Sequence, residues 1–351
     1  MSALVAATAL AGCSTDDTSA VVGTTTGTGG SGGQGAATGA AGHGGAGEGG
    51  EGIGGWSVDA GPPPFALGHV FVAGSRNAQV FEFDATLNPI AQFTHASFGQ
   101  VLPAPGQPYS EGPAGMAFDA SGYLVVAAKN EFCVFSGTNE PLACHPKYAP
   151  EPTENVIFDL DGNLYTTTAT GGTDQVRKYD AAYQYVTAFT MPTGQLTGVT
   201  CDPNGNLYVA SQLGGGASRI YKVDKASFAV LDTIEITGMI EGLQFAQDGN
   251  ILVGLDDAMG VLRVQPHSPT VVVDTITHPN LVWAVPLTTD DADNVYTADY
   301  ENGSGTAPAD LFVFDPTGNL IASRLPSEVY GPFGVVVAGA VLPCGAFHPP
   351  R

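Results

Sequence analysis

The most definite chemistry in this sequence belongs to two cysteines that flank one turn. Cys133 and Cys144 lie at equal distances from the turn-forming segment 137–140. Residues placed in this way face each other across two antiparallel strands, where the α-carbons are close enough for a disulfide. We therefore predict a Cys133–Cys144 disulfide that stabilises the fold by about 2–3 kcal/mol. The alternative is a pair of buried free thiols.

Clusters of aspartate form a second group of candidate ligands. Asp159 and Asp161 stand in one turn, and Asp290, Asp291 and Asp293 stand in another. Calcium loops are also rich in aspartate, but these clusters lack the EF-hand order of acids and its terminal glutamate. Asp and Asn tolerate the left-handed backbone of tight turns. We interpret the clusters as hairpin turns.

The charge of the chain and the spacing of its histidines disfavour a nucleic-acid site and a zinc site. Acidic residues outnumber basic residues by 34 to 11, which gives a net charge of −23. A surface this poor in Lys and Arg does not favour nucleic acid, because phosphate contacts need basic side chains. The seven histidines show no pair at ligand spacing, and no cysteine and histidine are spaced as in a zinc site.

A repeated hairpin must position whatever site exists. Residues 154–168 read as an apolar run, a turn of Asp, Gly and Asn, and a second apolar run, and similar segments begin at 112, 196 and 240. Their turn residues recur every 40 to 44 positions, a period that indicates a propeller or solenoid. A second marker, the end of an alternating strand, occurs in every repeat at Asp84, Ser136, Asp180, Asp224, Gln265 and Asp315.

The first repeat lacks its opening strand, and the end of the chain supplies a candidate. Residues 330–337 read like the start of another repeat that then stops. We expect this strand to pair with the strand that begins near Val70, which would close the ring and cover an exposed sheet edge. The predicted fold is an all-β, six-bladed β-propeller. A seventh blade that uses 62–67 as a strand is the alternative, although its prolines disfavour it.

The segments GPAGMAFDASG, LTGVTCDPNGNLYVAS and YGPFGVVV resemble NHL-repeat propellers and the related gluconolactonase and regucalcin family. The resemblance covers nearly all of residues 69–342 and implies metal ligands where the innermost strands open onto the central channel. The corresponding positions in this sequence are Ala114, Glu154, Thr197, Glu241, Trp283 and Phe333.

These positions depart from the family pattern. Two asparagine ligands are absent, although Asn155 adjoins Glu154. Glu154, Thr197 and Glu241 would still accept a divalent cation such as calcium, which takes oxygen ligands. Otherwise the two glutamates only line a wet channel. We expect a non-catalytic binding or scaffold module for a protein or glycan partner, with a metal-dependent lactonase as the alternative.

Two more cysteines, Cys201 and Cys344, fall in blades four and one, on opposite sides of the ring. We therefore predict that both are unpaired.

The N-terminal residues predict export. Residues 3–11 form an apolar run that is too short to span a bilayer, and it ends in LAGC, residues 10–13. This tetrapeptide resembles the lipobox of bacterial lipoproteins, which implies that Cys13 is lipidated. No basic residue precedes the apolar run, so we expect the natural start to lie upstream of Met1.

The predicted organisation has three parts. Residues 1–13 are a lipoprotein signal peptide and lipobox, residues 14–64 a disordered Gly-rich tether, and residues 65–351 the propeller. A flexible tether of that length spans roughly 40 Å. We expect a monomer in the cell envelope that contacts the membrane only through its lipid anchor.

Overall fold

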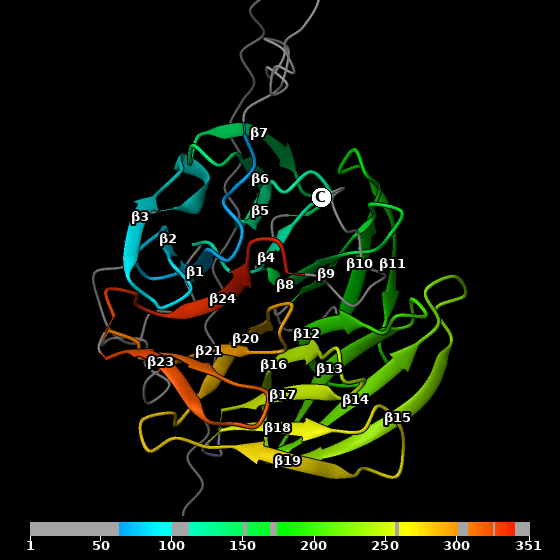
Figure 1. The fold of residues 1–351 in the computed structure, drawn as a ribbon. Helices are drawn as coiled ribbons and strands as arrows, with labels where there is room; N and C mark the ends of the chain where they lie inside the picture. Colours follow the sequence, from blue (N-terminus) through cyan, green and yellow to red (C-terminus); the bar gives the residue numbers. More distant parts are fainter. Residues whose placement is uncertain are drawn as a thin grey trace, which may run out of the picture. The chain divides into compact units, whose positions relative to one another are not determined.

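The propeller predicted from the repeats is present. The computed structural model describes residues 63–99, 112–149, 153–168, 174–256, 260–300, 308–325 and 327–340. These residues form six four-stranded antiparallel sheets, arranged as blades around a ring (Figure 1). Helical structure in these segments is limited to the 3-10 turn η1 (Ala96–Phe98), and none of it is long and apolar enough to cross a membrane.

Each blade runs from an innermost to an outermost strand. Blade one contains β24 (Pro332–Val337), β1 (Val70–Gly74), β2 (Gln79–Phe83) and β3 (Pro89–Phe93). Blade two contains β4 (Met116–Phe118), β5 (Leu124–Ala127), β6 (Glu131–Phe135) and β7 (Pro141–Pro146). Blade three contains β8 (Thr153–Phe158), β9 (Leu164–Thr168), β10 (Gln175–Tyr179) and β11 (Tyr185–Thr190). Blade four contains β12 (Gln195–Cys201), β13 (Leu207–Gly214), β14 (Ala217–Val223) and β15 (Val230–Thr237). Blade five contains β16 (Ile240–Phe245), β17 (Ile251–Leu255), β18 (Val261–Val264) and β19 (Val272–Ile276). Blade six contains β20 (Ala284–Thr289), β21 (Val295–Asp299), β22 (Leu311–Phe314) and β23 (Leu320–Arg324).

The two ends of the propeller sequence share blade one, as predicted. Strand β24 pairs antiparallel with β1, with Val337 opposite Val70 and Val335 opposite Val72. The pairing provides the innermost strand that the first repeat lacks, so the ring closes without a free inner edge. In Figure 1 the red β24 lies beside the blue β1.

The seventh-blade alternative is wrong. Residues 63–66 form no strand, and the carbonyl of Pro63 accepts the N–H of Gly137 at 2.8 Å. Phe65 is buried with its ring centroid 4.6 Å from that of Phe71. The segment therefore packs onto blades one and two.

The hydrophobic core lies between the blades. Six apolar clusters each join two neighbouring blades, and alternate residues of one strand enter different clusters. In β1, for example, Phe71 packs toward blade two and Val72 toward blade six. Because both faces of the inner strands are covered, strands such as β9, β12 and β20 are buried at nearly every position, and many of their polar residues are threonine.

The Asp-rich turns are hairpin turns, as interpreted from the sequence. The carboxylate of Asp159 accepts the backbone N–H groups of Asp161 and Asn163, each at 2.9 Å, and the hydroxyl of Tyr165 at 3.2 Å. The same contacts recur around Asp202 and Asp290. Each carboxylate closes its own turn, which explains why successive repeats carry an acid at this spacing.

Candidate functional site

The predicted channel positions coincide with breaks in strand register. The pairing of β8, β12 and β16 with the next strand skips one residue in each, and the skipped residues are Glu154, Thr197 and Glu241. An extra residue in one strand of an antiparallel pair is a β-bulge, which redirects its side chain. The three residues therefore occupy equivalent positions in consecutive blades.

One assignment in this row is wrong. Strand β20 skips two residues, Val285 and Pro286, between Ala284 and Leu287. Asp290, which closes the following turn, stands five residues after Val285, the same spacing that separates Thr197 from Asp202. Val285, and not Trp283, therefore occupies the equivalent position in blade six.

The three predicted metal ligands differ in their surroundings. The backbone of Glu154 lies in β8, but its side chain is outside the described part of the structure. The buried Thr197 donates its hydroxyl to the carbonyl of Ile240 at 2.6 Å and so ties blade four to blade five. Glu241 lines the cavity described next. A shared cation on all three residues stays a prediction.

A small cavity lies where the innermost strands converge. Its lining includes Met116 from β4, Asn155 from β8, Glu241 from β16, Val285 from β20 and Phe333 from β24. Its volume of about 20 Å³ has room for one water molecule or one ion. A sugar ring or peptide side chain would have to bind outside it.

Glu241 carries the strongest electrostatic perturbation near this cavity. Its side chain is partly exposed, but its carboxyl group is enclosed by protein, and Gln212 of β13 donates an amide hydrogen to it at 2.6 Å. Loss of hydration raises the pKa of Glu241 to about 7, and the negative charge of the buried Asp256 contributes to this rise, whereas the hydrogen bond from Gln212 opposes it. Glu241 therefore titrates near neutral pH, where an ordinary glutamate is fully ionised.

Glycines beside the bulges let neighbouring blades approach. A Cβ on Gly242 would lie 2.4 Å from the carbonyl oxygen of Val285, and one on Gly334 would lie 2.2 Å from that of Ala114. On Gly198 it would lie 2.8 Å from the Cβ of Leu243. These positions set the spacing of the inner ring, because any larger residue would push the adjacent strand away.

A row of aromatic rings leads away from the cavity. Phe333 packs edge-on against Tyr300, with ring centroids 5.1 Å apart, and Tyr300 lies nearly parallel to Trp283 at 6.4 Å. Tyr300 is buried, whereas Trp283 and Phe333 are half-buried. Phe333 lines the cavity together with Glu241 and Asn155, so the row begins beside these two polar side chains.

The cysteines give one confirmed and one wrong prediction. The Cys133–Cys144 disulfide joins β6 and β7 at directly opposed residues, with α-carbons 4.1 Å apart. Cys201 also forms a disulfide, so the prediction that it is unpaired is wrong. Cys344 and the predicted lipidation site Cys13 lie outside the described residues.

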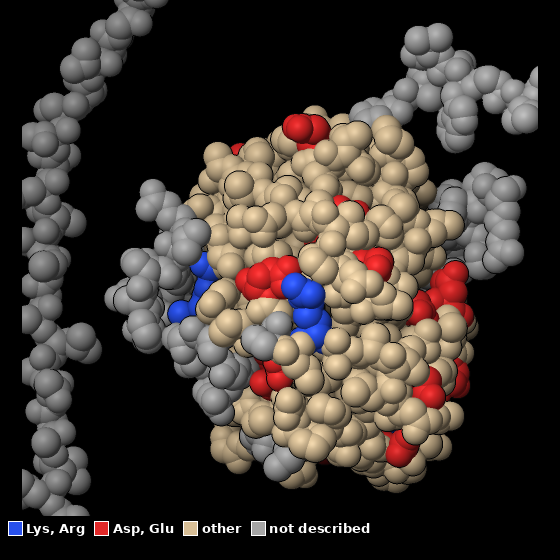
Figure 2. All heavy atoms as spheres, turned by 60° about the vertical axis from the view of Figure 1, so that its left-hand side comes forward, with Lys and Arg blue, Asp and Glu red and all other residues tan. Residues whose placement is uncertain are grey.

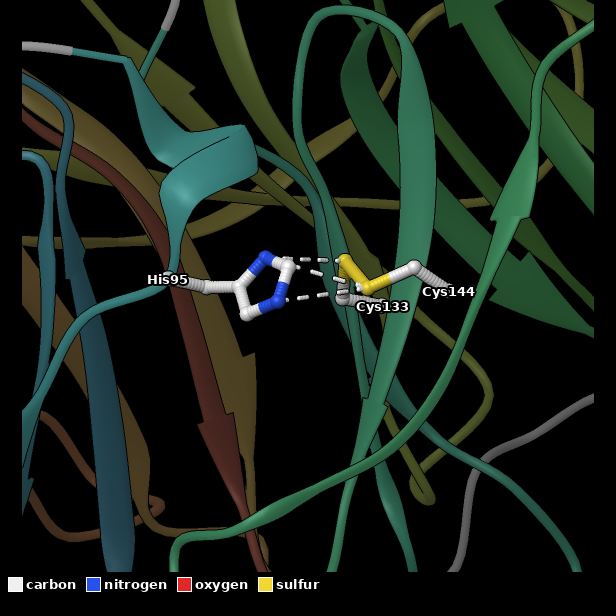
Figure 3. A group of neighbouring side chains, drawn as sticks. All are labelled: His95, Cys133 and Cys144. Carbon is white, nitrogen blue, oxygen red and sulfur yellow. Dashed lines mark hydrogen bonds between the residues drawn. A yellow bond between two sulfur atoms is a disulfide. The ribbon is translucent and has the colours of Figure 1, made fainter.

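One further contact has no counterpart in the sequence pattern. The ring of His95 lies against the Cys133–Cys144 disulfide (Figure 3). The histidine stands 38 residues before Cys133 in sequence and belongs to the connection after β3 in blade one. Only the packing of blade one on blade two brings the three side chains together.

Charged side chains form no broad basic face in the view of Figure 2. Acidic groups are spread over this surface, and the basic groups are few and lie close to acidic ones. Among the described pairs, Arg324 bonds to Glu328 at 2.7 Å and Arg219 to Glu235 at 2.8 Å.

Comparisons with known proteins support the propeller fold but do not identify a function. No protein-family model and no curated protein sequence matches the chain. Among solved structures, a protein of unknown function from Bacteroides caccae matches with TM-score 0.58 at 12% identity, over 77% of this chain and 98% of that one. A chain of a nidogen/laminin complex matches equally well, with TM-score 0.58, 15% identity and the same coverages. A streptogramin B lyase matches with TM-score 0.53 and 14% identity, over 82% of this chain and 93% of that one.

Proposed function

We propose that this chain is a non-catalytic binding module that presents the mouth of its propeller channel to a glycan or protein partner. The observation that carries the proposal is the chemistry of the channel row. Val285 and Phe333 are apolar, Thr197 bonds to the neighbouring blade, and Glu241 is the carboxylate that lines the described cavity. A lactone hydrolase needs a metal held firmly enough to polarise a carbonyl or activate water, and the described side chains of this row offer few oxygen ligands for it.

The aromatic row suits a binding surface. Aromatic rings provide a large contact area, and a few polar groups beside them fix the orientation of a ligand. Trp283 and Phe333 supply the rings here, and Glu241 and Asn155 supply the polar groups. The propeller fold by itself does not select this function, because propellers host many unrelated functions.

Replacing Trp283 by alanine is expected to weaken partner binding at least tenfold, because a partly exposed aromatic anchor carries much of the energy of an interface. The measurement is binding of the purified protein to glycan and peptide arrays, with the affinity of each hit then determined in solution. Tyr148→Ala is the matched control, because Tyr148 is an exposed aromatic residue that stacks on Tyr185 at the outside of blade three. Equal losses in both variants would contradict the proposal, as would tightly bound calcium together with lactone hydrolysis that Glu241→Gln abolishes.

We further propose that the module is exported and held at the cell envelope by lipid on Cys13. Disulfides persist in oxidising compartments, and this chain forms disulfides at Cys133 and at Cys201. Cys13→Ala is expected to move the protein from the membrane fraction to the soluble fraction and to remove incorporation of labelled fatty acid. A variant that stays in the membrane fraction would overturn the anchor.

A further inference from the structure

The distances from His95 to the two disulfide sulfur atoms match the nitrogen–sulfur separation of a zinc site. The Nδ1 atom of His95 lies 3.5 Å from the Sγ atom of Cys133 and 3.8 Å from that of Cys144. Tetrahedral zinc binds sulfur at about 2.3 Å and histidine nitrogen at about 2.0 Å, which places N and S about 3.5 Å apart. The histidine therefore already stands at the distance from each sulfur that a shared zinc ion would require.

The histidine ring is held there by groups other than the cysteines. The backbone N–H of Ser97 donates to Nδ1 at 3.2 Å, and the hydroxyl of Ser97 lies 3.0 Å from the same atom. That hydroxyl in turn donates to the carboxylate of Glu131. Nδ1 has one lone pair, so zinc bound at this atom must replace the Ser97 N–H. Zinc bound at Nε2, which lies 3.8 Å from the Sγ atom of Cys144, instead leaves Nδ1–H to donate to the Ser97 hydroxyl, the kind of outer contact that orients a ligating histidine.

The surroundings fit a site that is partly shielded from water. Phe98 and Phe135 are fully buried and place their rings about the histidine, with centroids 6.1 Å and 6.2 Å from its own. Cys133 is buried, whereas His95 and Cys144 are half-buried, so one side stays open to solvent. Glu131 lies two residues before Cys133 in β6 and therefore on the same face of the strand.

We propose that reduction of the Cys133–Cys144 disulfide opens a zinc site whose protein ligands are His95, Cys133 and Cys144. A dithiol reductant transfers two electrons and two protons to the disulfide, which becomes two thiols while the reductant becomes a cyclic disulfide. Zinc then displaces two protons to water and binds both thiolates and the imidazole, with water or the Glu131 carboxylate as the fourth ligand. Two thiolates and an imidazole favour zinc over calcium, which prefers oxygen.

The disulfide and the metal exclude each other, because both use the same pair of sulfur atoms. In the oxidised protein a covalent bond joins β6 to β7. In the reduced protein a zinc ion would join the same two strands and would also bind His95 in the connection after β3. Zinc binding thus reports the thiol redox state of the compartment. This inference concerns a site between blades one and two, and it is independent of the channel proposal.

Cobalt(II) is the probe for the test, because thiolate ligation gives it a charge-transfer absorption. The full chain, reduced with a phosphine under anaerobic conditions, is expected to bind one equivalent of cobalt with this absorption and to release it to zinc. The oxidised chain is expected to show none. Absence of the absorption in the reduced, folded chain overturns the proposal.

Variants separate this site from other thiols. The double variant Cys133→Ser/Cys144→Ser retains Cys201, so any absorption that survives in it comes from elsewhere and overturns the assignment. His95→Ala is expected to weaken cobalt binding at least tenfold. His267→Ala, which removes an exposed histidine in blade five, is expected to change nothing. Equal affinities of the His95→Ala variant and the unaltered chain would exclude His95 as a ligand.

A second measurement needs no substitution. In a thiol–disulfide buffer that leaves the Cys133–Cys144 bond mostly oxidised, micromolar zinc is expected to raise the reduced fraction, as read by alkylation and mass mapping of these two cysteines. A reduced fraction that zinc does not change would overturn the proposal even if the substituted chains fail to fold.

Discussion

Gly242→Ala is expected to destabilise the propeller by about 3 kcal/mol, at the upper end of the usual cost of overpacking a core. The added Cβ would lie 2.4 Å from the carbonyl oxygen of Val285 and 2.9 Å from the Cδ2 atom of Leu287. The leucine side chain can turn away, but the carbonyl belongs to the innermost strand of blade six. Blades five and six would have to separate, and every blade of a closed ring is fixed by two neighbours.

The measurement is the free energy of unfolding by denaturant, compared with that of Gly249→Ala. Gly249 belongs to the turn of the same blade and has a φ of +86°, and a Cβ added there would have no atom within 4 Å. Its substitution is expected to cost only about 1 kcal/mol, through the left-handed backbone alone. If both variants lose the same stability, the inner ring is more compliant than the contact distances indicate.

The same inner ring shows what the sequence could predict. Hairpins, repeat length and the Cys133–Cys144 pair depend on residues that are close along the chain, so their spacing alone is sufficient. The closing strand β24 is predictable because the first repeat lacks one strand and the end of the chain has one to spare. In each case the prediction depends either on a fixed repeat length or on the number of strands that every blade must contain.

Contacts between blades follow no such period. In blade six, Val285 and Pro286 lie opposite the single residue Ala298, a bulge that the sequence pattern does not show. His95 meets Cys133 across two blades, and Gln212 meets Glu241 across two others. These pairs depend on how bulges and connections aim each side chain, which a linear pattern does not show. The disulfide of Cys201 is not predicted, because the repeat pattern places no other cysteine in the same blade as Cys201 or in a neighbouring blade.

Glu241→Gln is expected to remove a pH dependence of stability that the unaltered protein shows between about pH 4.5 and 7. The pKa of Glu241 is raised from 4.5 to about 7 in the folded state, chiefly because the carboxyl group is withdrawn from water. The folded protein therefore keeps a proton that the unfolded chain releases in this range. The contribution of Glu241 to stability is complete below about pH 4.5, decreases as the pH rises, and is lost above about pH 7. At 1.36 kcal/mol per unit, the decrease is on the order of 3 kcal/mol.

Glutamine resembles the protonated carboxyl group in shape and charge, so the Glu241→Gln variant should be more stable than the unaltered protein at pH 8 and nearly equal to it at pH 4.5. Unfolding free energies measured across this range provide the test, with Glu140→Gln, an exposed residue before β7, as the control that should follow the unaltered protein. Curves for Glu241→Gln and the unaltered protein that stay parallel would show that this carboxyl group titrates normally. Calcium added at pH 8 extends the test. A cation in the cavity would stabilise the carboxylate form and restore the lost stability to the unaltered protein alone, whereas an equal response of both proteins would remove Glu241 from the predicted cation ligands.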